Sequence, residues 1–518
     1  MDANRRTISV EEILYYMLFA IISFTKGIGL DEGSFWFRAC LLVGICLLGA
    51  KFMIGKYSLA EIVAAGVLGI WGVFTFRVTG SLGMFIYIIF IIGMKNVPVR
   101  RVFGVGAAVW GTGMFFTAAA AVFGERMGVR LVHEKLGMGP LLRESLGYTH
   151  PNVLHITYVV LMAFVLYLCG RQRGKKLACT VCLLLLGDFY VFIYSLSYTG
   201  LLISFVYLGA FFYFTYRVRM SKAEHMLMQC IVPAFLLISV VFPLLFHDGP
   251  LYMIINGLLN SRVWAIRVFF DRYPVTLFGM SSEGMDFSID NSYVSALMGY
   301  GVIPWCGMMI AYWFLIRECM KRNKRKELAI ICAFLFAGLS EPFLFNASIK
   351  NITVIFLGEL LYEKLKGHKE IFKPCDKMNK MFEFPEISFR AINIKLVGIC
   401  FLLSFMLVFV YRSITADSGI TAVYANESLC DCRGTTVALP DNIETDKTII
   451  IGEKKDDINY YFFTRGNSNL IDVMDIRKNI SASIYISIIV GGIICILPST
   501  KEKRICDSKF FDTQGDKK

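Results

Sequence analysis

Long apolar runs alternate with short polar connections along most of the chain. A bilayer core needs about twenty mainly apolar residues for each spanning helix. Such runs predict twelve spans in the first 365 residues, near 13–30, 35–54, 59–76, 82–94, 102–123, 153–170, 177–194, 200–216, 227–246, 292–316, 328–339 and 349–362. Two further spans are predicted near 395–411 and 480–497. The pattern therefore predicts an all-α polytopic membrane protein.

Positively charged residues gather in every second connection. Arg5 and Arg6 precede the first span, and later basic clusters lie at 51–56, 95–101, 171–176, 217–222, 317–326, 364–380 and 501–504. Because Lys and Arg collect on the cytoplasmic side of a membrane, both termini are predicted to be cytoplasmic. The net charge of +13 comes largely from these connections, which argues against a nucleic-acid partner.

Three long connections lie on the opposite side of the predicted bundle, at 124–152, 247–291 and 412–479. The first two belong to a multi-span core of residues 1–365, and long connections in a compact protein are usually functional. A cytoplasmic linker is predicted at 366–394, and a cytoplasmic tail at 499–518. Residues 395–498 are predicted to form two spans around a small external domain, with short strands at 448–451 and 460–464.

The connection 247–291 carries the most distinctive charges. Residues 251–270 have the length and pattern of one interfacial helix, with Arg262 inside its apolar arc. Such an arginine must snorkel, pair with a carboxylate or bind an anionic ligand. Arg267 has a structural partner one turn on, in Asp271. Further along, Asp290 and Asn291 are expected to cap the next span, and this does not exclude a second role at the outer mouth.

Two other places carry candidate chemistry. Pro151 fits the first position of a helix, with Thr149 or His150 as its cap. Glu341 precedes Pro342 between two short apolar runs, so the chain is expected to break there. Glu341 then either pairs structurally with Lys350 or lines a cavity. Asp188, in the seventh predicted span, leaves the same two readings open.

Several short motifs resemble one family. These are Arg262-Val263-Trp264, Pro274 with Leu277-Phe278-Gly279, Asp290-Asn291-Ser292-Tyr293 and Tyr300-Gly301-Val302-Ile303. Together with the span pattern of residues 1–365, they resemble the bacterial Wzy-type polysaccharide polymerases and their O-antigen ligase relatives. The stretch 147–152 is similar to forms seen in Gram-positive members. Members often carry Ser-Arg-Thr where this chain has Ser197-Tyr198-Thr199, and the last two spans also depart from the usual pattern.

The resemblance implies a GT-C-like bundle in the bacterial cytoplasmic membrane. Such an enzyme is a metal-independent glycosyltransferase without a cofactor. It polymerises undecaprenyl-diphosphate-linked oligosaccharide repeats into capsule, exopolysaccharide or O-antigen-like polymer at the outer face, beside a flippase and a chain-length regulator. Transfer of finished glycan to another acceptor, as in a ligase, and transport of lipid-linked sugars are the alternatives. A transporter more often shows two matching halves, which this sequence does not.

The chemistry suggests a role for each candidate. Bidentate guanidinium groups suit phosphate oxygens and stabilise charge that develops on a leaving diphosphate. The residues expected to act in catalysis are Arg262, Arg267, Asp290, Glu341 and His150. Those expected to bind substrate are Arg272, Asn291, Tyr293, Asn152, Arg143 and Lys350.

Overall fold

The protein is described by a computed structural model. It covers residues 7–123, 130–134, 140–169, 174–217, 219–246, 248–258, 261–281, 289–383, 394–415, 421–426, 432–435, 450–451, 458–463 and 469–496.

Within these residues, nine helical segments are long and apolar enough to cross a membrane. They are α2 (Phe35–Ile54), α3 (Leu59–Thr79), α5 (Val99–Val122), α6 (Pro151–Leu168), α7 (Lys175–Ser195), α8 (Tyr198–Tyr216), Lys222–Leu245, α14 (Val302–Lys321) and Val397–Thr415. The expectation of a helical multi-pass membrane protein is confirmed at this level.

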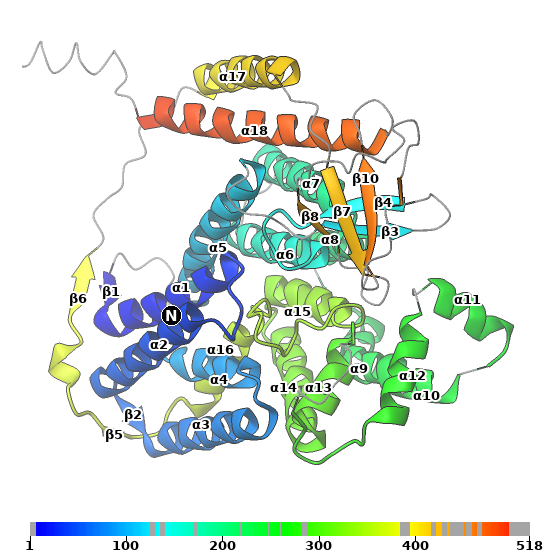
Figure 1. Cartoon of the computed structure of the whole chain (residues 1–518). Helices are drawn as coiled ribbons and strands as arrows, with labels where there is room; N and C mark the ends of the chain where they lie inside the picture. The colour runs from blue at the N-terminus through cyan, green and yellow to red at the C-terminus, as the bar shows by residue number, and fades with distance from the viewer. Residues whose placement is uncertain are drawn as a thin grey trace, which may run out of the picture. The chain divides into compact units, whose positions relative to one another are not determined.

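The chain divides into two compact units. The first holds residues 1–117 and 148–384, and the second holds residues 118–147 and 385–518. In the first unit α1 (Val10–Gly27) packs against α2, α8 against α15 (Arg325–Ala337), and α4 (Gly83–Gly93) against α16 (Val354–Leu365) (Figure 1). The short helices α4 and α15 are almost wholly buried. They can be shorter than a bilayer is thick because other helices surround them.

Several predicted helices are broken in the structure. The predicted span 292–316 is divided at Gly301 (φ 86°) into α13 (Ser292–Tyr300) and α14. The predicted helix 251–270 is divided into α11 (Pro250–Leu258) and α12 (Arg262–Arg272), with Ser261 at φ 61°. The span 227–246 lies within α9 (Lys222–Leu236), the π-helical turn η1 (Leu237–Val241) and α10 (Phe242–Leu245). The break expected at Glu341 is confirmed, because residues 338–353 are not helical.

The first part of the predicted linker folds back on the helices. Strand β5 (Glu370–Phe372) pairs with β2 (Tyr57–Ser58), and β6 (Met381–Glu383) pairs with β1 (Thr7–Ser9) (Figure 1). Beside these strands, the fully buried Lys51 ammonium lies 3.2 Å from the Glu11 carboxylate. Asn379 also donates to Glu11, at 3.3 Å. The segment is therefore fixed to the bundle by backbone pairing and by hydrogen bonds to a buried carboxylate.

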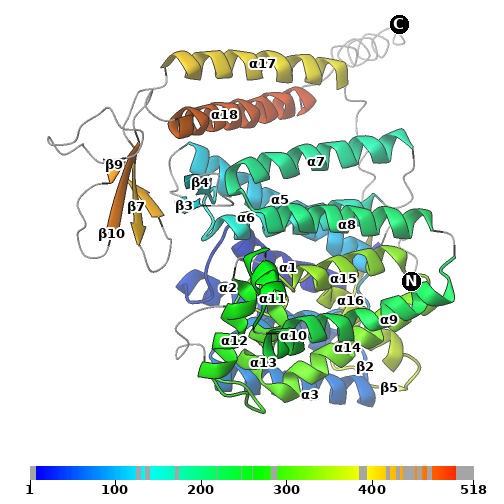
Figure 2. The same ribbon diagram turned by 90° about the vertical axis from the view of Figure 1, so that its right-hand side faces the viewer.

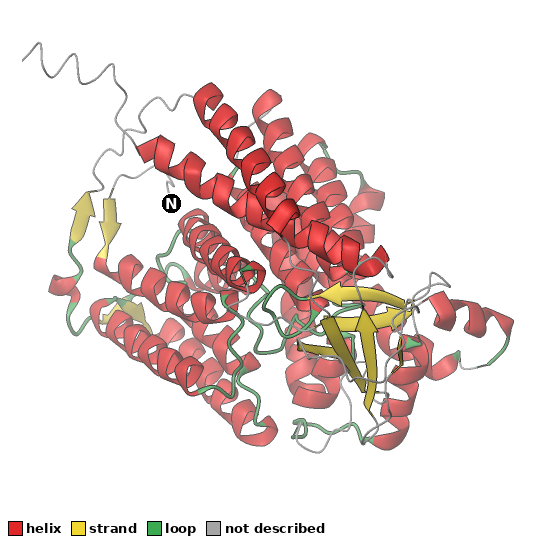
Figure 3. Ribbon diagram, turned by 45° about the horizontal axis from the view of Figure 1, so that its top comes forward, coloured by secondary structure: helices red, strands yellow, loops and turns green. Residues whose placement is uncertain are grey.

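The second unit combines a helical hairpin with a sheet. Helices α17 (Ile394–Thr415) and α18 (Asn469–Ile496) lie side by side (Figure 2). The sheet, whose strands are drawn in yellow in Figure 3, is antiparallel. Its strand order is β4-β3-β8-β7-β10-β9. Its strands are β3 (Arg130–Glu134), β4 (Pro140–Glu144), β7 (Thr421–Asn426), β8 (Cys432–Thr435), β9 (Ile450–Ile451) and β10 (Ile458–Phe463). Strands β9 and β10 match the predicted pair, whereas the contribution of the first long connection was not predicted.

Candidate functional site

The carboxyl group of Glu341 is the centre of a polar cluster in the first unit. Asn152, on the first turn of α6, donates to Glu341 Oε1 at 3.2 Å. Thr199, on the first turn of α8, donates to the same oxygen at 3.1 Å. Glu341 is only 6% exposed. The structure thus brings together three residues that lie up to 189 positions apart in sequence.

Local sequence explains why these donors lie at helix starts. His150 caps α6 by accepting from the amide of Asn152 at 3.1 Å, and Pro151 follows at the first helical position. Ser197 caps α8 by accepting from the amide of Gly200 at 3.2 Å. Its hydroxyl also lies 3.3 Å from that of Thr199. The cap expected at 149 or 150 is therefore His150.

Burial raises the pKa of Glu341 to about 7, and the charge of Asp290 acts in the same direction. The Arg262 cation, the hydrogen bond from Thr199 and the charged form of Lys350 oppose this rise. Burial in turn lowers the pKa of Lys350 to about 7. A carboxyl group with such a pKa can accept and release a proton near neutral pH.

Arg262 and Asp290 form an ion pair close enough to act on Glu341. Arg262 Nη2 lies 3.1 Å from Asp290 Oδ2, and the two side chains are 21% and 47% exposed. They line a hollow with Ser261, Trp264, Ala265, Ile266 and Ile289. Of the three options for Arg262, the structure therefore shows pairing with a carboxylate. Both side chains remain partly accessible to a ligand.

Helix starts add a favourable field for anions at this end of the bundle. Asn152, Thr199 and Asn291 lie at the N-termini of α6, α8 and α13. Asn291 donates to the carbonyl of Leu339, two residues before Glu341, at 3.1 Å. The helix dipole makes such termini suited to negative groups. The cluster around Glu341 thus combines a buried carboxyl group with an anion-favouring border.

Two predicted substrate-binding residues, Asn291 and Tyr293, make hydrogen bonds within the fold. Asn291 is buried and accepts from the amides of Tyr293 and Val294, both at 3.0 Å, while its own amide donates to Ser239 and Leu339. Tyr293 is fully buried, and its hydroxyl donates to the carbonyl of Leu335 at 2.7 Å. These hydrogen bonds hold α13 against its neighbours.

Of the remaining predicted residues, Lys350 lies near the Glu341 cluster, whereas the others lie on α12 and β4. Arg267 lies 3.8 Å from Asp271, as the sequence predicted, and both are well exposed. Arg272 is exposed at the end of α12. Lys350 is buried and donates to the carbonyl of Val153 at 3.0 Å. In the described chain it makes no ion pair with Glu341. Arg143 lies on β4, in the second unit.

His150 acts as a helix cap. Its Nδ1 accepts from a backbone amide, so in the neutral ring the proton lies on Nε2. In that tautomer His150 is a donor, and the basic role fits Glu341 better.

A second polar network, which the sequence did not predict as a set, joins α6, α7 and α8. His155 Nε2 lies 3.1 Å from Asp188 Oδ1, and His155 Nδ1 lies 3.2 Å from Ser195 Oγ. Ser204 donates to Asp188 Oδ1 at 2.7 Å. All four residues are fully buried. The sequence marked Asp188 as a lone charge in a span. It gave no sign that His155 belongs to this network or that Thr199 contacts Glu341.

Two of the quoted motifs contact each other. The amides of Val302 and Ile303 donate to the carbonyls of Thr276 and Leu277, at 3.0 and 3.1 Å. A Cβ atom on Gly301 would lie 2.2 Å from the backbone nitrogen of Gly279. Glycine is therefore required where the 277–279 motif crosses the start of α14.

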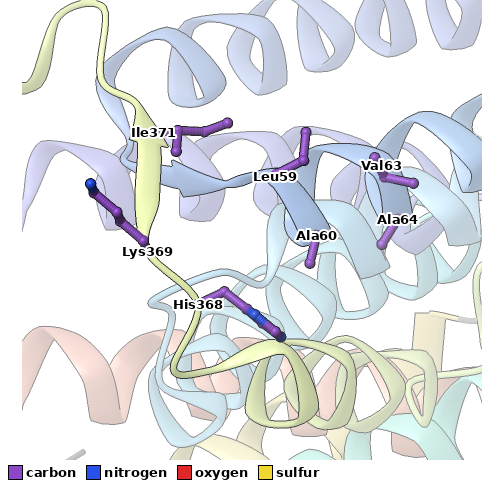
Figure 4. A pocket seen from close by; sticks show the side chains of 7 residues that line it. All are labelled: Leu59, Ala60, Val63, Ala64, His368, Lys369 and Ile371. Atoms are coloured by element: carbon purple, nitrogen blue, oxygen red, sulfur yellow. The ribbon is translucent and has the colours of Figure 1, made fainter.

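A further hollow lies between α3 and the segment that carries β5 (Figure 4). It is lined by Leu59, Ala60, Val63, Ala64 and Ile371, with His368 and Lys369. This mainly apolar groove lacks the convergent donors that a diphosphate needs.

Comparison with protein-family models, with curated proteins and with solved structures found no match to this chain. What the site does must therefore be argued from its residues and their contacts.

Proposed function

We propose that this protein is a membrane glycosyltransferase that polymerises polyprenyl-diphosphate-linked oligosaccharide repeats. The observation that carries the proposal is the buried Glu341 carboxyl group, held by Asn152 and Thr199, beside the accessible Arg262–Asp290 pair. A base and a guanidinium group at one end of a bundle of apolar helices suit a lipid-borne diphosphate donor. The motif resemblance to Wzy-type polymerases supports the same reaction.

In the proposed reaction, the acceptor hydroxyl loses its proton to the Glu341 carboxylate. The hydroxyl oxygen forms a bond to the anomeric carbon of the donor sugar. The bond from that carbon to the diphosphate oxygen breaks, and its electron pair leaves with the diphosphate. Arg262 stabilises the charge that develops there, and the anion-favouring helix starts add to this effect.

The proposed location is the outer face of the bacterial cytoplasmic membrane, with both termini in the cytoplasm. Basic residues support this orientation. Lys51 lies near the end of α2, Lys95 follows the end of α4 and Arg101 lies near the start of α5. These helix ends border the connections that are predicted to be cytoplasmic. A flippase would supply the substrate on the outer face, and a chain-length regulator is a further proposed partner.

The test is the lipid-linked glycan profile of a strain that lacks this protein. We expect single repeat units to accumulate on the outer carrier while polymer is lost. Wild-type protein should restore polymer, whereas Glu341→Gln should not. Glu318→Gln is a matched control, since Glu318 forms ion pairs with Arg322 and Lys364, away from the cluster. Restoration of normal polymer by Glu341→Gln would overturn the assignment of the base.

Two alternatives give different profiles. A ligase would leave long chains on the carrier. A transporter or flippase would leave repeats on the cytoplasmic side. The transporter alternative has one observation in its favour, the buried Asp188–His155 pair within the spans, because transport pathways often use ionisable residues there.

A further inference from the structure

The hydrogen bonds that join α6, α7 and α8 form a chain in which each donor can be assigned. The amide of Ser197 donates to Ser195 Oγ at 3.3 Å. With Asp188 ionised and the His155 ring neutral, His155 Nε2 donates to Asp188, and Nδ1 accepts from the Ser195 hydroxyl. Ser195 and His155 then each accept one hydrogen bond and donate one. The hydrogen bonds run from the Ser197 amide, at the N-cap of α8, to the carboxylate of Asp188 on α7.

The turn between α7 and α8 is short, so these bonds fix where α8 starts. Ser195 is the last residue of α7, Leu196 adopts the left-handed conformation (φ 42°), and Ser197 already caps α8. His155 reaches this turn because residue 200 is glycine. A Cβ atom there would lie 2.4 Å from the His155 ring. The imidazole is therefore enclosed between the turn, the start of α8 and Asp188.

The start of α8 carries Thr199, which donates to Glu341. We propose that Asp188, His155 and Ser195 are positioning residues that set the first turn of α8 and thereby hold the Thr199 hydroxyl against the Glu341 carboxyl group. This inference rests on the proposed function only for what Glu341 does, and not for the placement itself. Since Ser195 is fully buried, the Ser–His–Asp set is not a nucleophile in contact with a substrate.

The placement has a consequence that can be measured on Glu341. The Thr199 hydrogen bond favours the ionised carboxylate, so loosening it should raise the pKa of Glu341. The other charges acting on Glu341 are Asp290, Arg262 and Lys350, and none of them lies on α7 or α8. A shift caused by changes at 188 or 195 is therefore transmitted through the start of α8.

The experiment labels the purified full-length protein with dicyclohexylcarbodiimide, which modifies protonated carboxyl groups in apolar surroundings. Labelling of the Glu341 peptide is measured by mass spectrometry as a function of pH. We expect Thr199→Val to move the labelling midpoint upward by about one pH unit, which is the size expected for one hydrogen bond to a charged group. Ser195→Ala and Asp188→Asn should move it in the same direction.

Tyr158→Phe is the matched control. It removes a buried hydroxyl that joins α6 to α7, through the Leu184 carbonyl, without touching α8. Its midpoint should equal that of the wild type. Asp188→Asn keeps the volume of the side chain, so it remains informative if Ser195→Ala does not fold. Wild-type midpoints in both Ser195→Ala and Asp188→Asn, alongside a shifted Thr199→Val, would overturn the inference.

Polymer formation by the same variants separates this inference from the proposed function. We expect Ser195→Ala to lower kcat at least tenfold with little change in KM, because donor binding does not use Ser195. Shifted labelling in a protein that forms no polymer even as wild type would keep the positioning role and overturn the polymerase. Wild-type labelling midpoints in the Ser195 and Asp188 variants, together with polymer synthesis by the wild-type protein, would keep the polymerase and overturn the positioning role.

Discussion

Arg262→Ala separates catalysis from stability at the proposed site. In the folded protein the guanidinium pairs with Asp290 at 3.1 Å, but the carboxylate is 47% exposed. Ion pairs this accessible contribute about 0–1 kcal/mol to stability. A group that stabilises charge on a leaving diphosphate is worth about 3–4 kcal/mol in the transition state. The loss of rate should therefore far exceed the loss of stability, at about 10²–10³-fold.

The assay compares polymer synthesis and thermal unfolding of the same detergent-solubilised protein. We expect Arg262→Ala to lower the rate by that factor while the melting temperature falls by only a few degrees. Arg262→Lys should recover only part of the rate, because an ammonium group cannot bind phosphate oxygens in a bidentate manner. A rate within threefold of wild type would refute the role of Arg262. So would a parallel collapse of stability, since the change would then act on the fold.

Three further predictions test other parts of the structure. The rate should rise about tenfold per pH unit below pH 7 and level off above it, because burial raises the pKa of Glu341 to about 7 and only its ionised form accepts a proton; a profile flat from pH 5 to 8 would contradict this. Gly200→Ala should lower the melting temperature through a loss of about 1–3 kcal/mol, since its methyl group would overlap His155, whereas Gly209→Ala, where nothing lies within 4 Å, should not. Lys51→Met should cost about 3–5 kcal/mol by leaving the buried Glu11 carboxylate without its cation, and an unchanged thermal unfolding curve would show that the pair is dispensable.

Features that depend on neighbours in sequence could be predicted. Hydrophobic runs located most spans, and proline after Glu341 marked a true break. The cap at His150 and the Arg267–Asp271 pair also follow from spacing alone. These are local because helix length, capping and i,i+4 contacts involve residues within two turns of one another.

Features that depend on residues far away in the sequence could not be predicted. Thr199 bonds to a carboxyl group 142 positions away, and nothing in its own surroundings indicates this. Arg262 was ambiguous in sequence because its partner, Asp290, lies 28 positions on. The hairpin of β3 and β4 joins a sheet whose other strands begin at residue 421. The division of the predicted span at Gly301 likewise reflects the close approach of Gly279, which only the fold supplies.

The positions of the buried and the accessible charged groups support the proposed glycosyl transfer rather than transport. A transporter must expose its ion-binding groups to each side in turn, at the middle of the membrane. Asp188 is fully buried, and its Oδ1 interacts with His155 and Ser204, whereas its Oδ2 has no hydrogen-bond partner among the described residues. Arg262 and Asp290, by contrast, are partly accessible. They lie beside Glu341, whose pKa is raised by burial to about 7, so its carboxyl group can exchange a proton near neutral pH. Accessible charged groups beside Glu341 suit the proposed glycosyltransferase, because its proposed lipid-borne substrates would approach from the membrane and would not have to cross it.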